Sequence, residues 1–383
     1  MGDYDMNAYG RMLTDEARIS AYVASIRAAI RPGDVVVDLG TGTGVMALLA
    51  CQCGASRVYA IEPSEAIRLA QASAKANGFE DRIVFIRSFS TQVDLPEKGR
   101  VLISDLRGST PCFSTHLADL IDARARLLAP DARWICQADT LYVGVADLPD
   151  RGEQFAVQWD GSRWGLDLSA SIPFACNQVL RRTAKPGELL SAGQSWAQIR
   201  YPELVSPHVR GSAVLPIVRP GAARGLLLWF AAELFGGFGF SIAPGAPASV
   251  YQPIFLPWER AVDLRAGDTV EVQIAAVYSG HEYWWNWTSI IRREGQPAPV
   301  AAFSQSTLKG TILDPTTISQ SAENFAPKLT LAGEEAQFIL ARIDGRTTQA
   351  VLAAALRTRF PGRFADDAAA MARVSQIRRE FAQ

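Results

Sequence analysis

Short apolar runs alternate with longer stretches of helical periodicity over about the first 145 residues. The apolar runs predict buried strands at residues 35–37, 57–61, 83–86 and 101–104. The helical periodicity predicts helices over residues 14–30, 45–53, 64–77 and 117–128. Strands that alternate with helices form a parallel sheet with helices on both faces. We therefore predict a Rossmann-like α/β domain over residues 1–146.

The pattern changes after about residue 147. Helical periodicity fades, proline, glycine and tryptophan become frequent, and β-like runs follow at residues 224–231, 249–256, 269–278 and 283–291. This texture predicts an antiparallel β-barrel domain over residues 147–330. Helix formers return from Glu334, in alanine-rich runs that are broken by Gly345 and by Pro361-Gly362. They predict a small helical appendage over residues 331–383.

Two segments need an interpretation of their own. Residues 225–243 are the most membrane-like window, but they contain Glu233 and several glycines and are barely long enough to span a bilayer. We interpret them as two buried strands joined by a turn. Alternation along the strand that follows at residues 283–291 places Tyr283, Trp285 and Trp287 on one face. We predict that this face packs in the barrel core, with an aromatic wall for a substrate as the alternative.

The composition is that of a globular protein. Of 383 residues, 48% are hydrophobic and 20% charged, which excludes a mostly disordered chain. The net charge of -1 builds in no general attraction to nucleic acid or to an anionic membrane. Five cysteines and three histidines predict free thiols in a reducing compartment and no metal site. Residues 1–11 lack the apolar run of a secretory signal, so we expect a cytoplasmic protein.

The candidate chemistry centres on residues 35–44, Val-Val-Val-Asp-Leu-Gly-Thr-Gly-Thr-Gly. Gly40, Gly42 and Gly44 allow a sharp turn and the close approach of a ligand to the backbone. The helix behind them offers N–H groups at its start, and Glu62 at the end of the next strand can accept both hydroxyls of a ribose. The glycine spacing argues against a dinucleotide, and Asp38 before the turn suits a cationic ligand better than a diphosphate.

This turn, followed by Ala-Ile-Glu at the end of the second strand, resembles the S-adenosylmethionine loop of class I methyltransferases. More closely, the chain resembles the protein arginine methyltransferase family over roughly residues 4–325. The segments that carry this likeness are residues 11–18, 128–131, 140–143, 159–169 and 264–268. They resemble the family's N-terminal cofactor helix, its last sheet strands, its dimerisation arm (here at about 159–187) and a turn of its β barrel. The resemblance implies S-adenosyl-L-methionine as cofactor and a homodimer.

The resemblance also assigns cofactor roles. The residues implied are Met12, Arg18, Asp38, Gly40, Gly42, Gly44, Glu62 and Thr91. Arg18 would pair with the cofactor carboxylate, and Glu62 would hold the ribose. Asp38 would border the methionine part, and Met12 would pack near the sulfonium. The ordinary alternatives are a surface helix cation for Arg18 and a core side chain for Met12. At Thr91 the family has a glutamate that reads the adenine amine.

The substrate side departs from the family. Arginine methyltransferases carry two glutamates on one loop, because a guanidinium needs an acceptor at each edge. Here the first position is Asp105, which is one methylene shorter, and the second is Ser114, which is neutral. Arg107 adds a cation to the same loop. The family's Thr-His-Trp loop falls near residues 248–250, without its histidine. We therefore expect an acceptor other than a protein arginine.

Three residues are candidates for the chemistry of transfer. Alignment supplies much of the rate of an in-line displacement on a sulfonium, and the acceptor must lose a proton. Asp105 is the first candidate for orienting the acceptor or taking that proton, with a helix or loop cap as its alternative. His116 is the second candidate, with a surface or packing residue as its alternative. Arg107 either binds a substrate carboxylate or phosphate or is a solvated loop cation.

Residues 339–348 and 360–364 resemble small winged-helix modules that dock leader peptides in peptide-modifying pathways. The alternative is a helical cap over the barrel or a dimer support. Together these features predict a methyltransferase that acts on N or O of a peptide, an amino-acid-derived metabolite or another specialised metabolite. The rivals are a divergent protein arginine methyltransferase, a non-catalytic cofactor- or peptide-binding partner, and an enzyme that uses the cofactor for another reaction.

Overall fold

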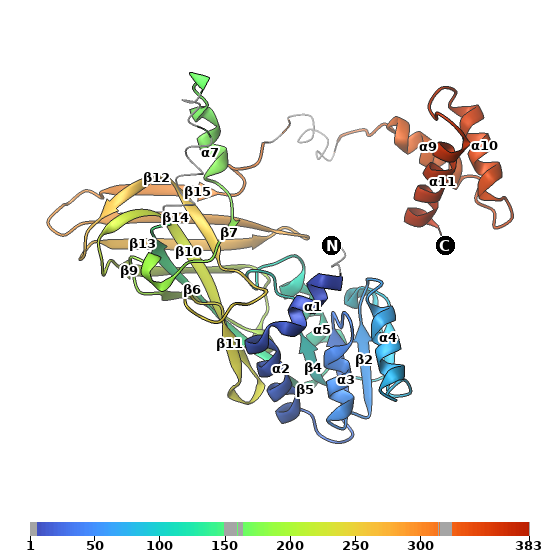
Figure 1. Ribbon diagram of the computed structural model, residues 1–383, viewed down its shortest axis with the longest axis horizontal. Coiled ribbons are helices and arrows are strands. Elements are labelled where there is room, and N and C mark those ends of the chain that lie inside the picture. Colours follow the sequence, from blue (N-terminus) through green and yellow to red (C-terminus); the bar gives the residue numbers. More distant parts are fainter. Residues whose placement is uncertain (1–5, 149–158, 160–163, 313, 315–323, 383) are drawn as a thin grey trace. The chain divides into compact units, whose positions relative to one another are not determined.

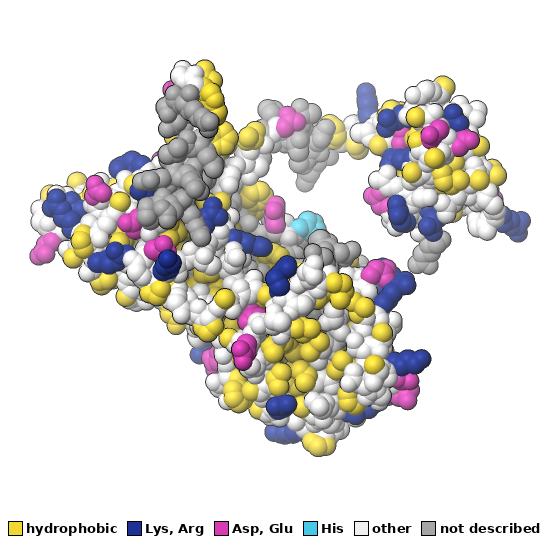
Figure 2. Space-filling model, viewed as in Figure 1, with side chains coloured by type: hydrophobic (Ala, Val, Ile, Leu, Met, Phe, Trp, Pro, Cys, Tyr) yellow, Lys and Arg dark blue, Asp and Glu magenta, His cyan; other side chains and the backbone are white. Residues whose placement is uncertain are grey.

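The protein forms two compact units, Met1–Ile312 and Leu313–Gln383 (Figure 1). The computed structural model describes residues 6–148, 159, 164–312, 314 and 324–382. Part of the predicted arm at 159–187 therefore lies outside the described residues. On the face that Figure 2 shows, cationic and anionic side chains are interspersed over both units.

A five-stranded parallel sheet carries the N-terminal half of the first unit. Its order is β3-β2-β1-β4-β5, and all four neighbouring pairs run parallel. The strands are β1 (Val35–Leu39), β2 (Arg57–Ile61), β3 (Ile83–Ile86), β4 (Gly99–Ser104) and β5 (Leu128–Trp134). The helices are α1 (Met6–Thr14), α2 (Glu16–Ala29), α3 (Val45–Gln52), α4 (Ile67–Ala76) and α5 (His116–Arg126), with the 3₁₀ turn η1 (Ser90–Gln92). The strand order reverses direction between β1 and β4, which is where open α/β sheets bind ligands.

The second half of the first unit forms two antiparallel sheets. The first has the order β7-β12-β10-β6-β8 with β11 beside β10, and the second has the order β15-β14-β13-β9. Their strands are β6 (Cys136–Ala146), β7 (Leu180–Arg181), β8 (Gln194–Arg200), β9 (Val209–Pro216), β10 (Gly221–Leu234), β11 (Gly239–Ser241), β12 (Ile254–Leu264), β13 (Thr269–Tyr278), β14 (Tyr283–Arg292) and β15 (Ala301–Ser306). Short helices at η3 (Ser169–Ser171), α7 (Ile172–Ala175), η4 (Pro186–Glu188), η5 (Tyr201–Glu203) and η6 (Phe235–Gly237) lie between them.

The predicted barrel is not seen as a closed one. Among the described residues, the hydrogen-bonded strands form two separate sheets instead of one continuous ring. Residues 140–143, expected among the last strands of the parallel sheet, lie instead in β6, which pairs with β10 and β8. β6 follows β5 after one residue, so the chain passes directly from the parallel sheet into the antiparallel part. The prediction that residues 249–256 form a strand is correct only from Ile254 onward.

The structure confirms the predictions for residues 225–243 and for the aromatic strand at residues 283–291. Residues 225–243 form most of β10 and β11, which pair antiparallel across a turn. No helix in the described part of the chain has both the length and the apolar character of a membrane span. Tyr283, Trp285 and Trp287 are buried, and Trp287 is only 1% exposed, so the aromatic stripe of β14 belongs to the core.

The second unit is a bundle of three helices, α9 (Leu331–Leu340), α10 (Gln349–Arg359) and α11 (Asp367–Phe381). Each begins at a side-chain cap, on Thr330, Thr348 and Asp366 respectively, which satisfies an N–H group of the first turn. The helices enclose a core of their own that includes Ile339 and Leu356. The prediction of a helical appendage is thus confirmed, and residues 324–382 contain no strand that could form a wing.

Candidate functional site

The glycine turn lies between β1 and α3, at the edge of the sheet where the parallel strands end. Gly40, Gly42 and Gly44 have φ values of 72°, 54° and 85°, a region that favours glycine. A Cβ at Gly44 would lie 2.7 Å from the Cβ of Ala70, and one at Gly42 would lie 3.1 Å from the ring of Tyr9. The glycines are therefore required both by the turn itself and by the elements that pack against it.

Two buried carboxylates flank this turn. Asp38, near the end of β1, is 2% exposed, and Glu62, just after β2, is 8% exposed. The Glu62 oxygens accept from the N–H groups of Gly42 and Ser64, both at 3.0 Å, and Asp38 accepts from the Thr41 hydroxyl at 2.6 Å. No cationic side chain of the described residues forms an ion pair with either carboxylate. Within the described residues, the two carboxylates therefore have no charge partner of their own.

Burial governs the charge of Asp38. The pKa of its carboxyl is raised to about 7, chiefly by burial and also by the nearby Glu62, against the hydrogen bond from Thr41. A cation beside Asp38 would favour the ionised form. The two carboxylates therefore favour a ligand with a positive centre.

Helices α1 and α2 bring further residues to the site. Met12 is half-buried, and its carbonyl oxygen accepts from Nη1 of Arg18 at 2.9 Å. Tyr9, whose ring lies against Gly42, was not predicted from the sequence, because no motif around it marked it as part of the site. Asp15 caps α2 by accepting from the Arg18 N–H, and it also accepts from the Ser249 hydroxyl at 2.6 Å. This contact ties α2 to the loop in which the family histidine is missing.

A buried chain of alternating charges joins α2, the loop after β4 and strand β6, and we call it the Arg18–Asp139 network. Its members are Arg18, Asp105, Arg107 and Asp139. Arg18 Nε donates to Oδ2 of Asp105 at 2.6 Å, and Arg107 Nη1 donates to Oδ1 at 2.7 Å. Arg107 Nε in turn donates to Asp139 at 2.7 Å. The side chains of Arg107 and Asp139 are both 0% exposed. The network therefore places Arg107 inside the protein, which contradicts its interpretation as a solvated loop cation.

The network determines the charge of Asp105. Burial alone would raise its pKa, but the neighbouring Arg18 and Arg107 outweigh burial and lower the pKa to about 2. A carboxylate with so low a pKa is a weak proton acceptor near neutral pH. Asp105 is thus suited to orienting a group and poorly suited to removing a proton.

Three residues that the sequence analysis singled out, His116, Thr91 and Ser114, do not belong to this network. His116, at the start of α5, is 3% exposed, and its Nδ1 lies 2.9 Å from the Pro111 carbonyl oxygen. Burial, followed by the charge of Arg107, lowers its pKa to about 4, so the ring is neutral at neutral pH. Thr91 is exposed on η1. Ser114 has a φ of 47°, and no other described non-glycine residue has a positive φ. This loop therefore holds a strained backbone beside the network.

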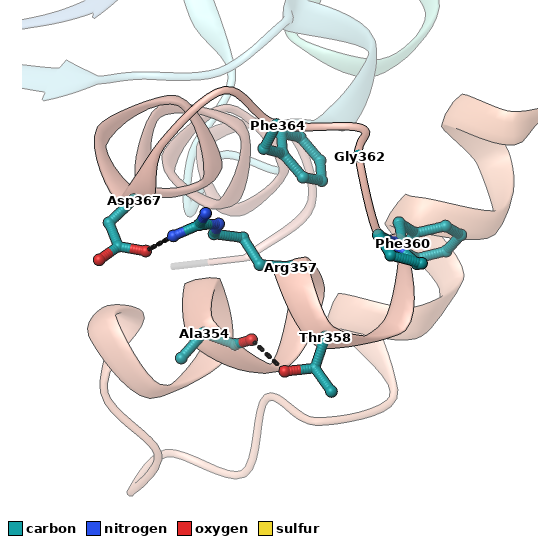
Figure 3. A pocket seen from close by; sticks show the side chains of 8 residues that line it. Ala354, Arg357, Thr358, Phe360, Gly362, Phe364 and Asp367 are labelled. Atoms are coloured by element: carbon teal, nitrogen blue, oxygen red, sulfur yellow. Dashed lines mark hydrogen bonds and ion pairs between the residues drawn. The ribbon is translucent and has the colours of Figure 1, made fainter.

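The second unit has a hollow of its own, with a volume of about 440 Å³. It lies at the end of α10 and the start of α11, and Figure 3 shows Phe360 and Phe364 at its edge. Arg357 pairs with Asp367 inside it, so its main charges are already matched within the unit (Figure 3).

Known proteins resemble the chain over both its sequence and its fold. A family model described as ribosomal protein L11 methyltransferase (PrmA) matches residues 20–106. A probable protein arginine N-methyltransferase 6 of Arabidopsis thaliana is 32% identical over 166 residues, which cover 43% of this chain and 38% of that protein. Protein arginine N-methyltransferase 6 of Xenopus laevis is 26% identical over 240 residues, covering 59% and 70%. The chain thus spans well under half of the first relative and about two thirds of the second.

Solved structures extend the likeness through the antiparallel sheets. The Trypanosoma brucei PRMT1 enzyme-prozyme heterotetrameric complex with AdoHcy has a TM-score of 0.72 at 20% identity and covers 79% of this chain and 98% of that one. The fold is that of the protein arginine methyltransferases. Arabidopsis thaliana protein arginine methyltransferase 10, in an open conformation, has a TM-score of 0.68 at 18% identity, covering 79% and 97%. The resemblance expected from the glycine turn and the flanking segments is confirmed.

Proposed function

We propose that this chain is an S-adenosylmethionine-dependent methyltransferase whose cofactor binds at the glycine turn. The observation that carries this proposal is the buried carboxylate pair Asp38 and Glu62, which lies on an arginine-methyltransferase fold and has no cationic partner among the described residues. The cofactor has a sulfonium and an ammonium group, which match such an anionic site. When bound, it supplies an activated methyl group. The complex from Trypanosoma brucei, which contains AdoHcy, supports the same assignment.

The residues of this site would divide the work of binding. Glu62 would accept from the ribose hydroxyls, because it closes the strand next to the turn. Asp38 and Gly40 would border the methionine part, and Arg18, which has donors beyond those bound to Asp105 and Met12, would pair with the cofactor carboxylate. Met12 would pack against the same part of the ligand. Of the predicted set, Thr91 has the weakest support, because it is exposed on η1.

For the acceptor, we propose an N or O atom of a peptide or specialised metabolite. Asp105 would orient this group, because its low pKa makes it a poor base. His116 is buried and neutral and donates or accepts within its own loop. The acceptor would therefore be a nucleophile whose lone pair is available without a general base, such as an uncharged amine, and the methylated product would release its proton to water. Methylation of a protein arginine is the alternative, which the names of the relatives favour.

Calorimetry with S-adenosylmethionine and with S-adenosylhomocysteine tests the cofactor proposal directly. Replacing Glu62 by Gln should weaken binding by about 1.5–3 kcal/mol, the value of a hydrogen bond to a charged group. Glu80→Gln is a matched control, because Glu80 is exposed between α4 and β3. If wild-type protein binds neither compound, or if Glu62→Gln binds as tightly as the control variant, the proposal fails. Transfer is then followed with a labelled methyl donor and a fractionated lysate, which separates protein acceptors from small ones.

A second candidate function is that of a non-catalytic partner. Asp105 stands at the position of the family's first glutamate. It lies between two arginines, and its low pKa makes it unsuited to act as a general base. The complex from Trypanosoma brucei pairs an enzyme with a prozyme. Cofactor binding without methyl transfer to any fraction would favour this role, and any transfer that requires Glu62 would exclude it.

Assembly and location remain proposals of the same kind. We propose a homodimer, a cytoplasmic location and peptide docking on the second unit, in line with the family resemblance and with the heterotetramer of the Trypanosoma brucei complex. Light scattering on the purified chain measures the oligomeric state. Peptide docking is tested by comparing how candidate precursor peptides bind to the whole chain and to a chain that lacks residues 331–383.

A further inference from the structure

Arg107 has no donor left over. Its guanidinium carries five N–H groups, and five contacts account for them. Nε and Nη2 donate to the two oxygens of Asp139 at 2.7 and 3.1 Å, and Nη1 donates to Tyr22 and to Asp105, both at 2.7 Å. Nη2 also contacts the sulfur of Cys136. The bidentate contact with Asp139 is the geometry with which carboxylates recognise arginine.

Asp105 is equally occupied. Oδ1 accepts from Arg107, Oδ2 accepts from Arg18, and the Tyr251 hydroxyl donates to the same carboxylate. The Arg18–Asp139 network contains two guanidiniums and two carboxylates, so its net charge is zero. A further cation at Asp105 would meet two fixed positive neighbours and no unmatched negative one, at a buried site where such repulsion is screened little.

Displacing Arg107 would not free the site. Asp139 lies in β6, is 0% exposed, and accepts from the Tyr201 hydroxyl as well. Moving the Arg107 side chain away would leave a buried carboxylate without its partner, which is strongly unfavourable. The aromatic rings of Tyr201, Phe230 and Phe240 surround the same guanidinium at 5.9 Å from their centroids. The carboxylates and the aromatic rings together thus fix the position of the Arg107 guanidinium.

We propose that Arg107 determines acceptor specificity by occupying Asp105, so that the site rejects cationic side chains, including a substrate arginine, and admits an uncharged acceptor. This inference rests on the proposed function for the location of the acceptor beside Asp105. It differs from the two roles expected from the sequence, because here Arg107 contacts neither solvent nor a substrate anion. It acts on the acceptor through Asp105.

The test removes the Arg107 cation from Asp105 without leaving Asp139 as an unpaired buried charge. In Arg107→Gln/Asp139→Asn, both charges disappear while hydrogen-bonding side chains remain, and Asp105 loses its second cation. Asp139→Asn alone keeps Arg107 on Asp105, and Arg100→Gln replaces an exposed arginine of β4 as a control. Binding is measured by calorimetry, in the presence of S-adenosylhomocysteine, with a peptide that contains one arginine and with the same peptide containing citrulline, its uncharged isostere.

The wild type, Asp139→Asn and Arg100→Gln should all bind the citrulline peptide more tightly than the arginine peptide, because Arg107 stays on Asp105 in each of them. The double variant should prefer the arginine peptide over the citrulline peptide by about 10- to 100-fold, the worth of charged hydrogen bonds. A wild-type preference for the arginine peptide overturns the inference, as does a double variant that binds S-adenosylhomocysteine normally and shows no preference. If the double variant does not fold, the wild-type comparison still decides. Failure of the wild type to bind S-adenosylhomocysteine would instead count against the proposed function.

Discussion

Asp38 makes cofactor affinity depend on pH in a predictable direction. Its folded-state pKa is about 7 because its carboxyl is buried. A cationic ligand binds the ionised form, so affinity should rise with pH until Asp38 is fully ionised. With a pKa of about 7, the ionised fraction rises about tenfold between pH 6 and pH 8, which corresponds to about 1.4 kcal/mol of binding free energy. Thr41 opposes the shift by donating to Asp38, so Thr41→Val should move the rise to higher pH.

Titration calorimetry with S-adenosylmethionine at several pH values between 6 and 8 measures this rise. Asp38→Asn should bind more weakly near pH 8 and should lose most of the pH dependence over this range. S-adenosylhomocysteine lacks the sulfonium charge, so its affinity should rise less steeply. A wild-type affinity that stays flat from pH 6 to pH 8, or an Asp38→Asn variant that keeps the full rise, would refute the role of this carboxyl.

Three further outcomes are expected. Gly44→Ala should destabilise the fold by about 1–3 kcal/mol through backbone strain and a clash, and more than Gly33→Ala, which has a similar φ of 89° but open space around it; urea denaturation compares them. Asp139→Ala should cost about 3–5 kcal/mol because it leaves the buried guanidinium of Arg107 without its bidentate partner, and a loss below 1 kcal/mol would contradict the buried network. His116 has a folded pKa of about 4, below its unfolded value, so the stability it contributes is present above the unfolded value and falls as pH drops from about 6.5 to 4; His116→Gln should flatten acid unfolding in this range.

The cofactor side of the site could be predicted from the sequence because its residues are close together along the chain. Asp38, Gly40, Gly42 and Gly44 lie within one strand–turn–helix segment, and Glu62 closes the next strand. The structure places these residues at one edge of the sheet, as the strand and helix periodicity predicted. Their roles in binding the cofactor remain proposals, which the experiments above address.

The acceptor side could not be predicted in the same way. Arg107 meets Asp139 across 32 residues and Tyr22 across 85, and no local pattern pairs them. The sequence marked Arg107 as unusual for its loop but left open whether it faced solvent or a substrate. Its partner Asp139 carried no signal at all, because an isolated aspartate within an apolar strand gives no hint of what it faces.

The sequence by itself determined the parallel sheet, its glycine turn and the helical second unit, since period, turn residues and caps act over a few neighbouring positions. The tertiary structure alone decided that the strands after β5 form two open sheets and that Arg107 is bound inside the protein. Those outcomes depend on which distant strands pair and which charges are buried together. The free energy of a buried charge depends on all of its neighbours in space, and only the folded chain specifies them.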